Sequence, residues 1–477
     1  MSRQSPDQRI IVAAVYVASM LMNTLDSTIV IVALATLGRE FNVPAVQTEA
    51  VVVAYLVSLA VFIPASGWLG DRFGTKRIFL IALAIFVFAS MLCGFSRSLE
   101  QLVAFRVLQG AGGGLMTPVG MAMLYRTFPP AERVAVGRIL MFATILGPAL
   151  GPIIGGVLIE RLSWHWAFFV NVPVGLVAFM VGLFFLHEHR EPAPGAFDLP
   201  GFVLGGAGLA AGMYALSEGP AHGWTSPDIL GPGVVGLALI AAFVARELRT
   251  VAPMVDLRLL GNRLFRSTLV VSFFGSAGFI GVLFLIPLFL QEVQGASPLE
   301  SGLTTFPEAI GVVTSTQIVA RLYPRVGPRR LMCGGLLGLS VSIVALATIG
   351  LSSSEPWVVR VLMFFVGFCM AYVFLPNQAA SLATISRAQT GRATTLTNVQ
   401  RQVGGALGVA VLSSVVAAAS AFIEGPTDPT PYRYALYCAA AFAFVGAIAA
   451  LQVPDAEAAE TMRPRAAREK PVLVEAG

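Results

Sequence analysis

Apolar residues form fourteen long runs along the chain, and short polar segments separate them. The runs approach the ~20 residues that an α-helix needs to cross a bilayer, and they are continuous rather than alternating as in membrane barrels. The first run is longer than the apolar part of a secretory signal peptide and lacks a small-residue cleavage site, so we expect it to stay in the protein. The predicted transmembrane helices cover residues 11–36, 50–70, 78–96, 99–125, 136–159, 166–187, 199–217, 228–247, 265–290, 301–321, 331–351, 357–383, 394–423 and 433–452.

Composition excludes a soluble protein. Of the 477 residues, 56% are hydrophobic and 12% are charged, and the mean hydropathy is +0.79. Soluble proteins carry roughly 25% charged residues, so this chain has too few to cover a water-exposed surface. The sequence therefore predicts an all-α membrane protein with 14 transmembrane helices.

The positions of Lys and Arg indicate the orientation. With the N-terminus in the cytoplasm, 24 of the 31 basic residues fall on the cytoplasmic side, as the positive-inside rule requires. Two more, Arg106 and Arg401, lie within predicted helices. Five fall on the outer side: Arg39, Arg97, Arg161, Arg360 and Arg433. We expect both termini in the cytoplasm, and we attribute the net charge of +5 to topology and anionic membrane lipids, not to nucleic acid.

The polar segments divide the chain into four parts. Residues 1–190 are predicted to form an N-terminal six-helix bundle, 191–250 an inserted pair (helices seven and eight), 251–455 a C-terminal six-helix bundle, and 456–477 a cytoplasmic tail. The loop "GWLGDRFGTKR" (67–77) follows the second helix, and "ARLYPRVGPRR" (320–330) follows the second helix of the last six. Such a repeat between two six-helix halves is typical of transporters.

Several motifs resemble the major facilitator superfamily, and within it the fourteen-helix drug:proton antiporter family. The loop at 67–77 resembles the signature loop of the superfamily. "LDSTIVIVAL" (25–34), "RVLQGAGGG" (106–114) and "GPALGPIIGG" (147–156) resemble the first-helix, arginine and antiporter motifs of that branch. "WHWAFFVNVPVG" (164–175), "LQEVQGASPLESGL" (290–303) and "NVQRQVGGALG" (398–408) also match it. The resemblance implies a major facilitator fold, with two six-helix bundles plus two additional helices, and proton-coupled multidrug efflux.

Asp26 is an acidic residue in the otherwise apolar first helix. Ionisable groups within a membrane are costly and mark functional sites by default. Because a low-dielectric environment favours the neutral form of a carboxyl group, we expect this one to exchange a proton or to pair with a cationic substrate. A purely structural hydrogen bond or ion pair is the alternative.

Arg106 and Gln109 in the fourth helix are the expected partners of Asp26. The helix rise places Arg106 roughly 10 Å and Asp26 roughly 16 Å below the outer ends of their helices, and an arginine side chain can close much of that gap. The family resemblance implicates this arginine in proton transfer. Because arginine keeps its own proton, its physical role is to tune a nearby carboxylate or water. A fixed structural pair is the alternative.

Glu308 is the main acidic group of the second half, about seven residues into the tenth helix and directly after Pro307. A proline kinks a helix and frees a backbone carbonyl, which suits a polar site facing a cavity. The resemblance implies cation recognition or additional proton coupling there. A water-exposed group near the outer surface is the alternative.

The loop at 67–77 is predicted to be a conformational latch between the bundles. Gly67 and Gly74 are expected to permit a tight turn. Asp71 is expected to cap the N-terminus of a neighbouring helix, where the helix dipole favours negative charge. Three basic residues are expected to bind lipid headgroups or Asp71 itself: Arg72, Lys76 and Arg77. A loop that only sets topology is the alternative.

The predicted fifth helix contains "ILGPALGPIIGG" (145–156), which is rich in glycine and proline. Small residues let helices approach closely in a membrane, and prolines bend a helix. Close packing alone accounts for the glycines, whereas two prolines one turn apart favour a hinge and seal at the bundle interface, which the resemblance associates with exporters. The residues form two rows, Gly147, Gly151 and Gly155 in one, and Pro148, Pro152 and Gly156 in the other.

Other polar residues carry weaker signals. Asn398 and Arg401, with Gln402 beside them, are predicted to form a second polar cluster near the inner end of the thirteenth helix, unless Arg401 extends to the cytoplasm. The four cysteines lack the spacing of a metal site and are interpreted as buried small hydrophobes. The sequence contains no Walker loop, catalytic arrangement, metal motif or cofactor motif, so we expect neither an enzyme nor an ATP-driven pump.

The sequence thus predicts a monomeric exporter in the inner (plasma) membrane of a bacterium. Its expected partners are protons, membrane lipids and a lipophilic, often cationic, small molecule. Alternating access of a central site, driven by the proton gradient, is the expected mechanism. An exporter of a specific lipid or metabolite on the same scaffold is the main alternative. A non-transporting receptor and an importer are the others, and the fifth helix argues against an importer.

Overall fold

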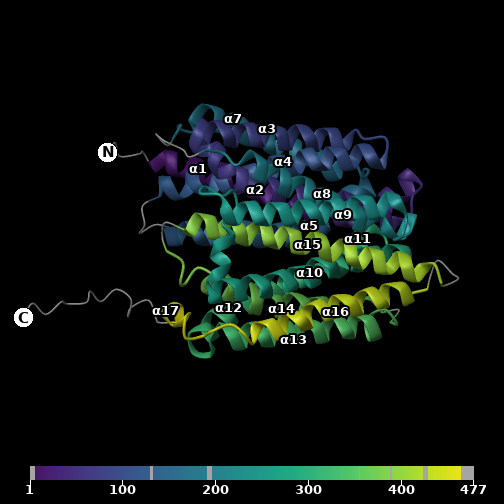
Figure 1. Ribbon diagram of the computed structural model, residues 1–477. Helices are drawn as coiled ribbons and strands as arrows, with labels where there is room; N and C mark the ends of the chain where they lie inside the picture. The colour runs from purple at the N-terminus through teal and green to yellow at the C-terminus, as the bar shows by residue number, and fades with distance from the viewer. Residues whose placement is uncertain are drawn as a thin grey trace, which may run out of the picture.

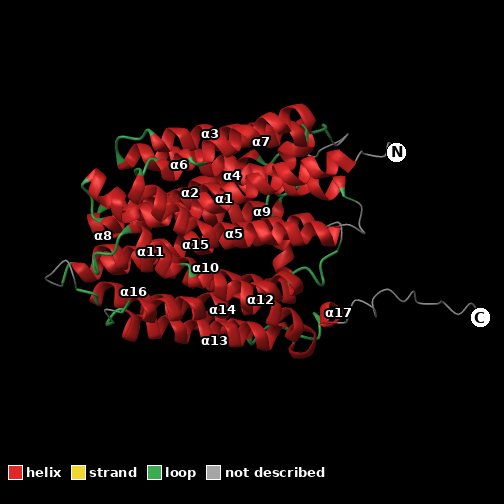
Figure 2. Cartoon of the chain, turned by 180° about the vertical axis from the view of Figure 1, so that it is seen from behind, coloured by secondary structure: helices red, strands yellow, loops and turns green. Residues whose placement is uncertain are grey.

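The computed structural model describes residues 6–128, 133–190, 196–353, 355–386, 389–422 and 428–462. Within these ranges the chain forms helices and no strand (Figure 2). The first helix, α1, begins at the same end of the molecule at which the last, α17, is found (Figure 1). We call this end the termini face and the opposite end the far face. Residues 191–195, at the start of the predicted inserted pair, and 463–477 of the predicted tail lie outside the described ranges.

The helices before residue 190 pack together as an N-terminal group. α2 and α3 both pack against α4, and α1 packs against α5 and α7. Fully buried apolar side chains such as Ile29, Phe79 and Phe86 fill these contacts. The elements are α1 (Pro6–Phe41), η1 (Ala45–Thr48), α2 (Glu49–Phe73), α3 (Thr75–Gly94), α4 (Leu99–Thr127), α5 (Arg133–Arg161), α6 (Trp166–Phe169) and α7 (Asn171–Phe185).

The helices after residue 262 form a C-terminal group. α10 packs against α15 and α16, α13 packs against α14 and α16, and α12 packs against α14. The elements are α10 (Arg263–Glu292), α11 (Pro298–Thr305), α12 (Pro307–Val326), α13 (Pro328–Ala345), the π-helical turn η3 (Leu346–Gly350), α14 (Pro356–Ala380), α15 (Thr390–Ser420), α16 (Thr430–Ala450) and α17 (Ala459–Met462).

An inserted pair of helices, α8 (Leu199–His222) and α9 (Pro227–Arg249), lies between these groups in sequence. α8 packs against α9 and also contacts both α2 and α15, so it lies along the seam between the two groups. The short helix η2 (Leu257–Gly261) follows α9. α9 exposes apolar side chains such as Val234 and Leu237, as expected of a helix that faces lipid.

The fourteen predicted spans are confirmed as helical segments of the described chain. Eleven are long and apolar enough to cross a membrane by length and composition alone. The other three are α4, α5 and the α11–α12 pair, which carry motifs rich in glycine, proline or polar residues. The predicted span at 301–321 is interrupted at Phe306, because Pro307 cannot donate a backbone hydrogen bond.

Polar contacts join the two groups in the half of the molecule toward the far face. Gln291 of α10 donates to the Val32 carbonyl (3.0 Å), and Ser413 of α15 donates to the Val46 carbonyl (3.1 Å). Glu160 of α5 accepts from the Leu299 backbone N–H (3.3 Å). Exposed Arg39 and half-buried Glu292 also form an ion pair there. The seam is therefore closed toward the far face.

Candidate functional site

Asp26 is the centre of a buried polar cluster in the N-terminal group. Its side chain is 0% exposed, and three side chains from two neighbouring helices donate to it. Arg106 Nη1 of α4 lies 2.5 Å from Asp26 Oδ2. Gln109 Nε2, also of α4, and Asn171 Nδ2 of α7 donate to Asp26 Oδ1 at 2.7 Å and 2.8 Å. The carboxylate is thus fully hydrogen-bonded, as a charge in an apolar interior requires.

The buried charge of Arg106, which is 1% exposed, is stabilised by further contacts besides Asp26. Its Nε donates to the Val51 carbonyl at 3.2 Å, and its Nη1 also donates to Gln109 Oε1 at 2.7 Å. The guanidinium lies 3.9 Å above the ring of Tyr55, whose hydroxyl donates to Asn23. A buried ion pair persists only when further hydrogen bonds satisfy both ions, and this pair meets that condition.

The structure therefore brings Asp26, Arg106 and Gln109 together. Asn171 and Tyr55 were not predicted from the sequence. Asn171 was visible as a polar residue within an apolar run, but only the fold places α7 beside α1. Asn171 also donates to Ser90 at 3.1 Å, so its amide is held from two sides.

Asn171→Ala tests whether this amide positions the carboxylate. Removing one hydrogen bond to a buried charged group should lower stability by about 2 kcal/mol. The unfolding temperature of the purified protein measures this. Ser90→Ala, which leaves all three donors to Asp26, should lose less stability than Asn171→Ala. An unchanged unfolding temperature in Asn171→Ala would show that the amide does not hold the carboxylate.

Glu308 lies in the seam between the two groups. It is 4% exposed, which contradicts the alternative of a water-exposed group near the outer surface. Its carboxyl has no hydrogen-bond partner within the described residues. It faces a cavity of about 20 Å³, which is large enough for roughly one water. The cavity is lined by Thr28, Ile31, Val32, Pro148, Pro152, Leu283, Pro287, Thr305 and Glu308.

The two rows of small residues on α5 face different partners. A Cβ at Gly147 or Gly151 would overlap the side chains of Thr24 and Thr28, so this row packs against α1. A Cβ at Gly155 would lie 3.1 Å from the Ile29 backbone. The second row faces the C-terminal group, because Pro148 and Pro152 line the Glu308 cavity. A Cβ at Gly156 would lie 2.7 Å from Leu299 Cα of α11.

The loop at 67–77 differs in two respects from expectation. Gly67 lies within helix α2, so only Gly74, with φ of +103°, makes the turn. Asp71 caps no helix among the described residues and instead lies 3.3 Å from Arg126 of α4. Glu188, which follows α7, takes the capping position by accepting from the backbone N–H groups of Lys76 and Arg77 (3.0 and 3.1 Å). The side chains of Arg72 and Arg77 are exposed.

The second loop repeats this arrangement. Gly327 has φ of +83° between α12 and α13, as Gly74 has between α2 and α3. Asp455, which follows α16, accepts from the Arg329 backbone N–H at the start of α13 (2.9 Å). In each half, an acidic residue that follows the sixth membrane span (α7 or α16) thus caps the N-terminus of the third span (α3 or α13). Pro324, which stands where the first loop has Asp71, lies within α12 and forms no ion pair.

Asn398 and Arg401 are not brought together by a hydrogen bond. Both lie on α15; Asn398 is half-buried and Arg401 is exposed. Within the described part of the chain, neither has a hydrogen-bond or ion-pair partner. The second polar cluster expected from the sequence is therefore absent in this conformation.

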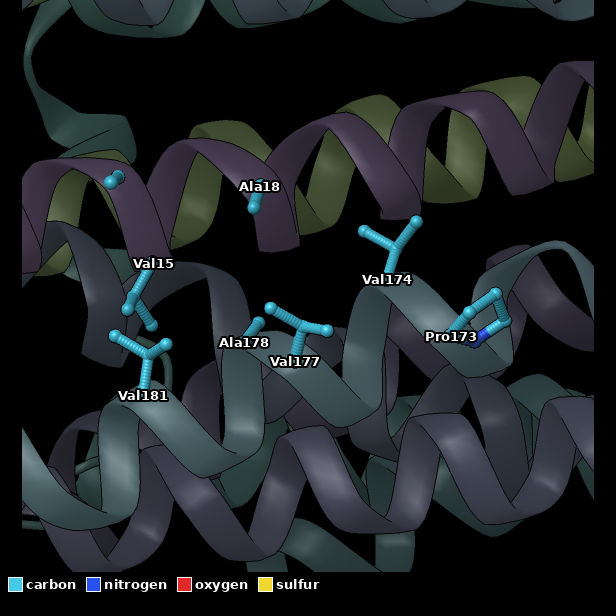
Figure 3. Close-up of a pocket in the computed structure, with 8 residues that line it drawn as sticks. Val15, Ala18, Pro173, Val174, Val177, Ala178 and Val181 are labelled. Carbon is cyan, nitrogen blue, oxygen red and sulfur yellow. The ribbon is translucent and has the colours of Figure 1, made fainter.

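A larger hollow lies between α1 and α7 and is apolar throughout. It measures about 500 Å³, and Figure 3 shows Val15 and Ala18 of α1 facing Val174, Val177 and Val181 of α7. Every residue that lines it is Ala, Val or Pro. This hollow suits a hydrocarbon chain and offers a charged molecule no partner.

These features define a multi-pass membrane transporter: two helical groups meet along a seam, one holds a buried ion pair, and a carboxyl group faces the seam. The chain belongs to the Major Facilitator Superfamily, whose family model matches residues 16–409.

Known proteins resemble the chain over most of its length. It is 35% identical over 410 residues to the multidrug resistance protein B homolog of Mycobacterium tuberculosis, covering 84% of this chain and 75% of that protein. Its fold is similar to the crystal structure of a D-xylose-proton symporter, with a TM-score of 0.69 and 16% identity over 94% of this chain and 99% of that chain. It is also similar to the crystal structure of the peptide transporter POT, with a TM-score of 0.68 and 14% identity over 94% of this chain and 95% of that chain.

Proposed function

We propose that the protein is a proton-driven antiporter that exports lipophilic, often cationic, compounds from the bacterial cytoplasm across the inner membrane. The observation that carries this proposal is the buried Asp26–Arg106 pair, a titratable carboxyl within a membrane-spanning helix. The similarity to a multidrug resistance protein supports the substrate class.

Protonation of Asp26 is the proposed switch. A proton on the carboxyl removes its attraction to Arg106 and leaves the guanidinium with the Val51 carbonyl, Gln109 and the Tyr55 ring. The cluster joins α1, α4 and α7, so a change in its charge alters the packing of three helices at once. One charge that crosses 100 mV supplies about 2.3 kcal/mol, which is available to drive this change.

Alternating access follows from the two groups moving as units about the seam. The structure holds the seam closed toward the far face, where Glu160 and Leu299 meet. The distribution of basic residues supports cytoplasmic termini, so we propose that this is the conformation in which the substrate site opens inward. Because Pro148, Pro152 and Gly156 line the seam, we propose that α5 bends there and seals the site during the change.

Reconstitution in liposomes tests the proposed function. The protein is placed in vesicles with a permanently charged quaternary ammonium dye outside, and the interior is made acidic. An antiporter lets protons leave while the dye accumulates, and a protonophore abolishes the accumulation. Dye uptake driven by an alkaline interior would indicate symport instead, and uptake indifferent to pH would overturn proton coupling. Transport of lipids or metabolites in place of the dye would favour a specific exporter.

Glu308→Gln tests the proposed role of the seam carboxyl in cation recognition. The variant removes a carboxyl group that is 4% exposed in the seam and that, once ionised, pairs with a cationic substrate, so export of a cationic dye should fall several-fold more than export of a neutral dye of similar size. Paired transport assays with the two dyes measure this. Glu300→Gln, which changes an exposed acidic residue on α11, is the matched control. If Glu308→Gln exports each dye as fast as the wild-type protein does, Glu308 has no role in cation recognition.

A further inference from the structure

The inserted pair α8–α9 takes no part in the proposed proton switch, yet its end at the termini face holds two buried acidic residues. Asp198 is the N-cap residue of α8 and is 6% exposed. Glu247 lies in the last turn of α9 and is 0% exposed. Acidic side chains are almost never fully buried unless they are paired, so their surroundings require an account.

Each carboxylate has one satisfied oxygen and one unpartnered oxygen. Asp198 Oδ1 accepts from Arg246 Nε (2.8 Å) and the Gly201 backbone N–H (3.1 Å). Glu247 Oε2 accepts from the Val255 backbone N–H (3.0 Å). Asp198 Oδ2 and Glu247 Oε1 are buried and have no donor.

The two unpartnered oxygens both lie beside Gly201. A Cβ built on Gly201 would be 2.5 Å from Glu247 Oε1 and 2.6 Å from Asp198 Oδ2. Both atoms therefore crowd one point beside the first turn of α8. Two ionised carboxylates repel each other in a low-dielectric setting, and here neither of the two facing oxygens has a donor to offset that repulsion.

The charged groups around the pair do not neutralise it. Among the described residues, Arg246 of α9 is the one basic residue whose charge attracts the Glu247 carboxylate. Its hydrogen bonds, however, go to Asp198. On the linker, Asp256 is paired with Arg392 of α15 (3.1 Å), and Arg258 donates to the Leu248 and Thr250 carbonyls. From α2 the neighbour is Trp68, which packs on Phe197. Two carboxylates thus share one arginine.

We propose that Asp198 and Glu247 form a proton-binding site in which Asp198 Oδ2 and Glu247 Oε1 share one proton. That proton supplies the missing donor to both oxygens and removes the excess negative charge. Within the described residues no third acidic, histidine or cysteine ligand joins them, which disfavours a metal ion.

The site connects the inserted pair to the C-terminal group. Glu247 accepts a hydrogen bond from the Val255 backbone N–H. The next residue, Asp256, forms an ion pair with Arg392 in the first turn of α15. Loss of the shared proton makes the carboxylates repel and separates the end of α9 from the start of α8. The linker at 250–256, and with it the position of the inserted pair along the seam, therefore responds to pH at the termini face.

The test measures the thermal unfolding of the purified full chain in nanodiscs across a pH series. The folded chain holds a proton that the unfolded chain releases, so raising the pH from mildly acidic to mildly alkaline should lower the unfolding temperature. In Glu247→Gln the amide donates to Asp198 without titrating, and this part of the pH dependence should be lost. Asp198→Asn, which keeps an N-cap side chain, should show the same loss and serves if Glu247→Gln does not fold.

A spectroscopic measurement and a control complete the test. The infrared band of a protonated carboxyl, which shifts in D₂O, should lose one component in Glu247→Gln. Glu300→Gln should keep both that component and the wild-type pH dependence. A pH dependence of the unfolding temperature that is identical in wild type, Glu247→Gln and Asp198→Asn would overturn the proposal. So would stabilisation by sodium or magnesium ions that both variants lose, because the site would then hold a metal cation.

Discussion

In the Asp26→Asn variant, accumulation of a cationic dye driven by an acidic vesicle interior should fall to the level of empty liposomes. Asparagine occupies the same volume and still accepts a hydrogen bond from Gln109 or Asn171, but it cannot take up and release a proton. The variant leaves Arg106 without its counter-ion, and an unpaired buried charge costs about 3–5 kcal/mol. The Val51 carbonyl and the Tyr55 ring offset part of that cost.

Two measurements separate lost coupling from lost folding. Dye-for-dye exchange without a proton gradient needs the moving bundles but no proton, so Asp26→Asn should retain it. The double variant Asp26→Asn/Arg106→Gln contains neither buried charge and should fold at least as well as the single variant, again without proton-driven uptake. Wild-type proton-driven uptake by a correctly folded Asp26→Asn protein would remove Asp26 from the mechanism.

The fourteen helices were predictable because lipid imposes a simple constraint: a spanning segment must satisfy its backbone hydrogen bonds internally, which favours long apolar helices. The breaks within spans were harder to predict. The proline that follows residue 306 predicts a break there. The junction between α6 and α7 at Val170 is not followed directly by a proline or glycine that would predict it. Helix ends also run past the apolar runs, as α1 does at Phe41, because backbone hydrogen bonding continues where the polar residues begin.

The candidate site was predictable where one residue is chemically out of place. Asp26 and Arg106 stand out as charges in apolar helices, and the helix rise put them at compatible depths. Asn171 and Glu188 were missed because their importance depends on which helices are neighbours, and sequence periodicity does not give that. Gly67 and Asp71 were placed wrongly for a related reason: a motif gives the residues of a loop but not where its helix ends or which acid reaches the next N-terminus.

The packing at Gly156 leads to the other large expected effect, on the balance between conformations. A Cβ at this position would lie 2.7 Å from Leu299 Cα and 2.8 Å from the Pro298 carbonyl, and backbone atoms cannot move aside as a flexible side chain can. The clash exists only while α5 and α11 are together at the seam. Overpacking of this kind costs about 1–3 kcal/mol. Because it penalises one conformation alone, it should shift the ratio of closed to open far-face states by roughly 5–150-fold.

Gly156→Ala should therefore open the seam toward the far face and slow dye export. Spin labels are placed at Leu162, directly after α5, and at Leu303 of α11, which are both exposed, in a variant without the four native cysteines. They report the separation of α5 and α11. The distance distribution should move to longer values in Gly156→Ala. Gly334→Ala is the matched control, since a Cβ there meets nothing within 4 Å and alanine favours the helix. If both variants keep the wild-type distances, α5 and α11 tolerate the added methyl group and their close approach does not set the conformational balance.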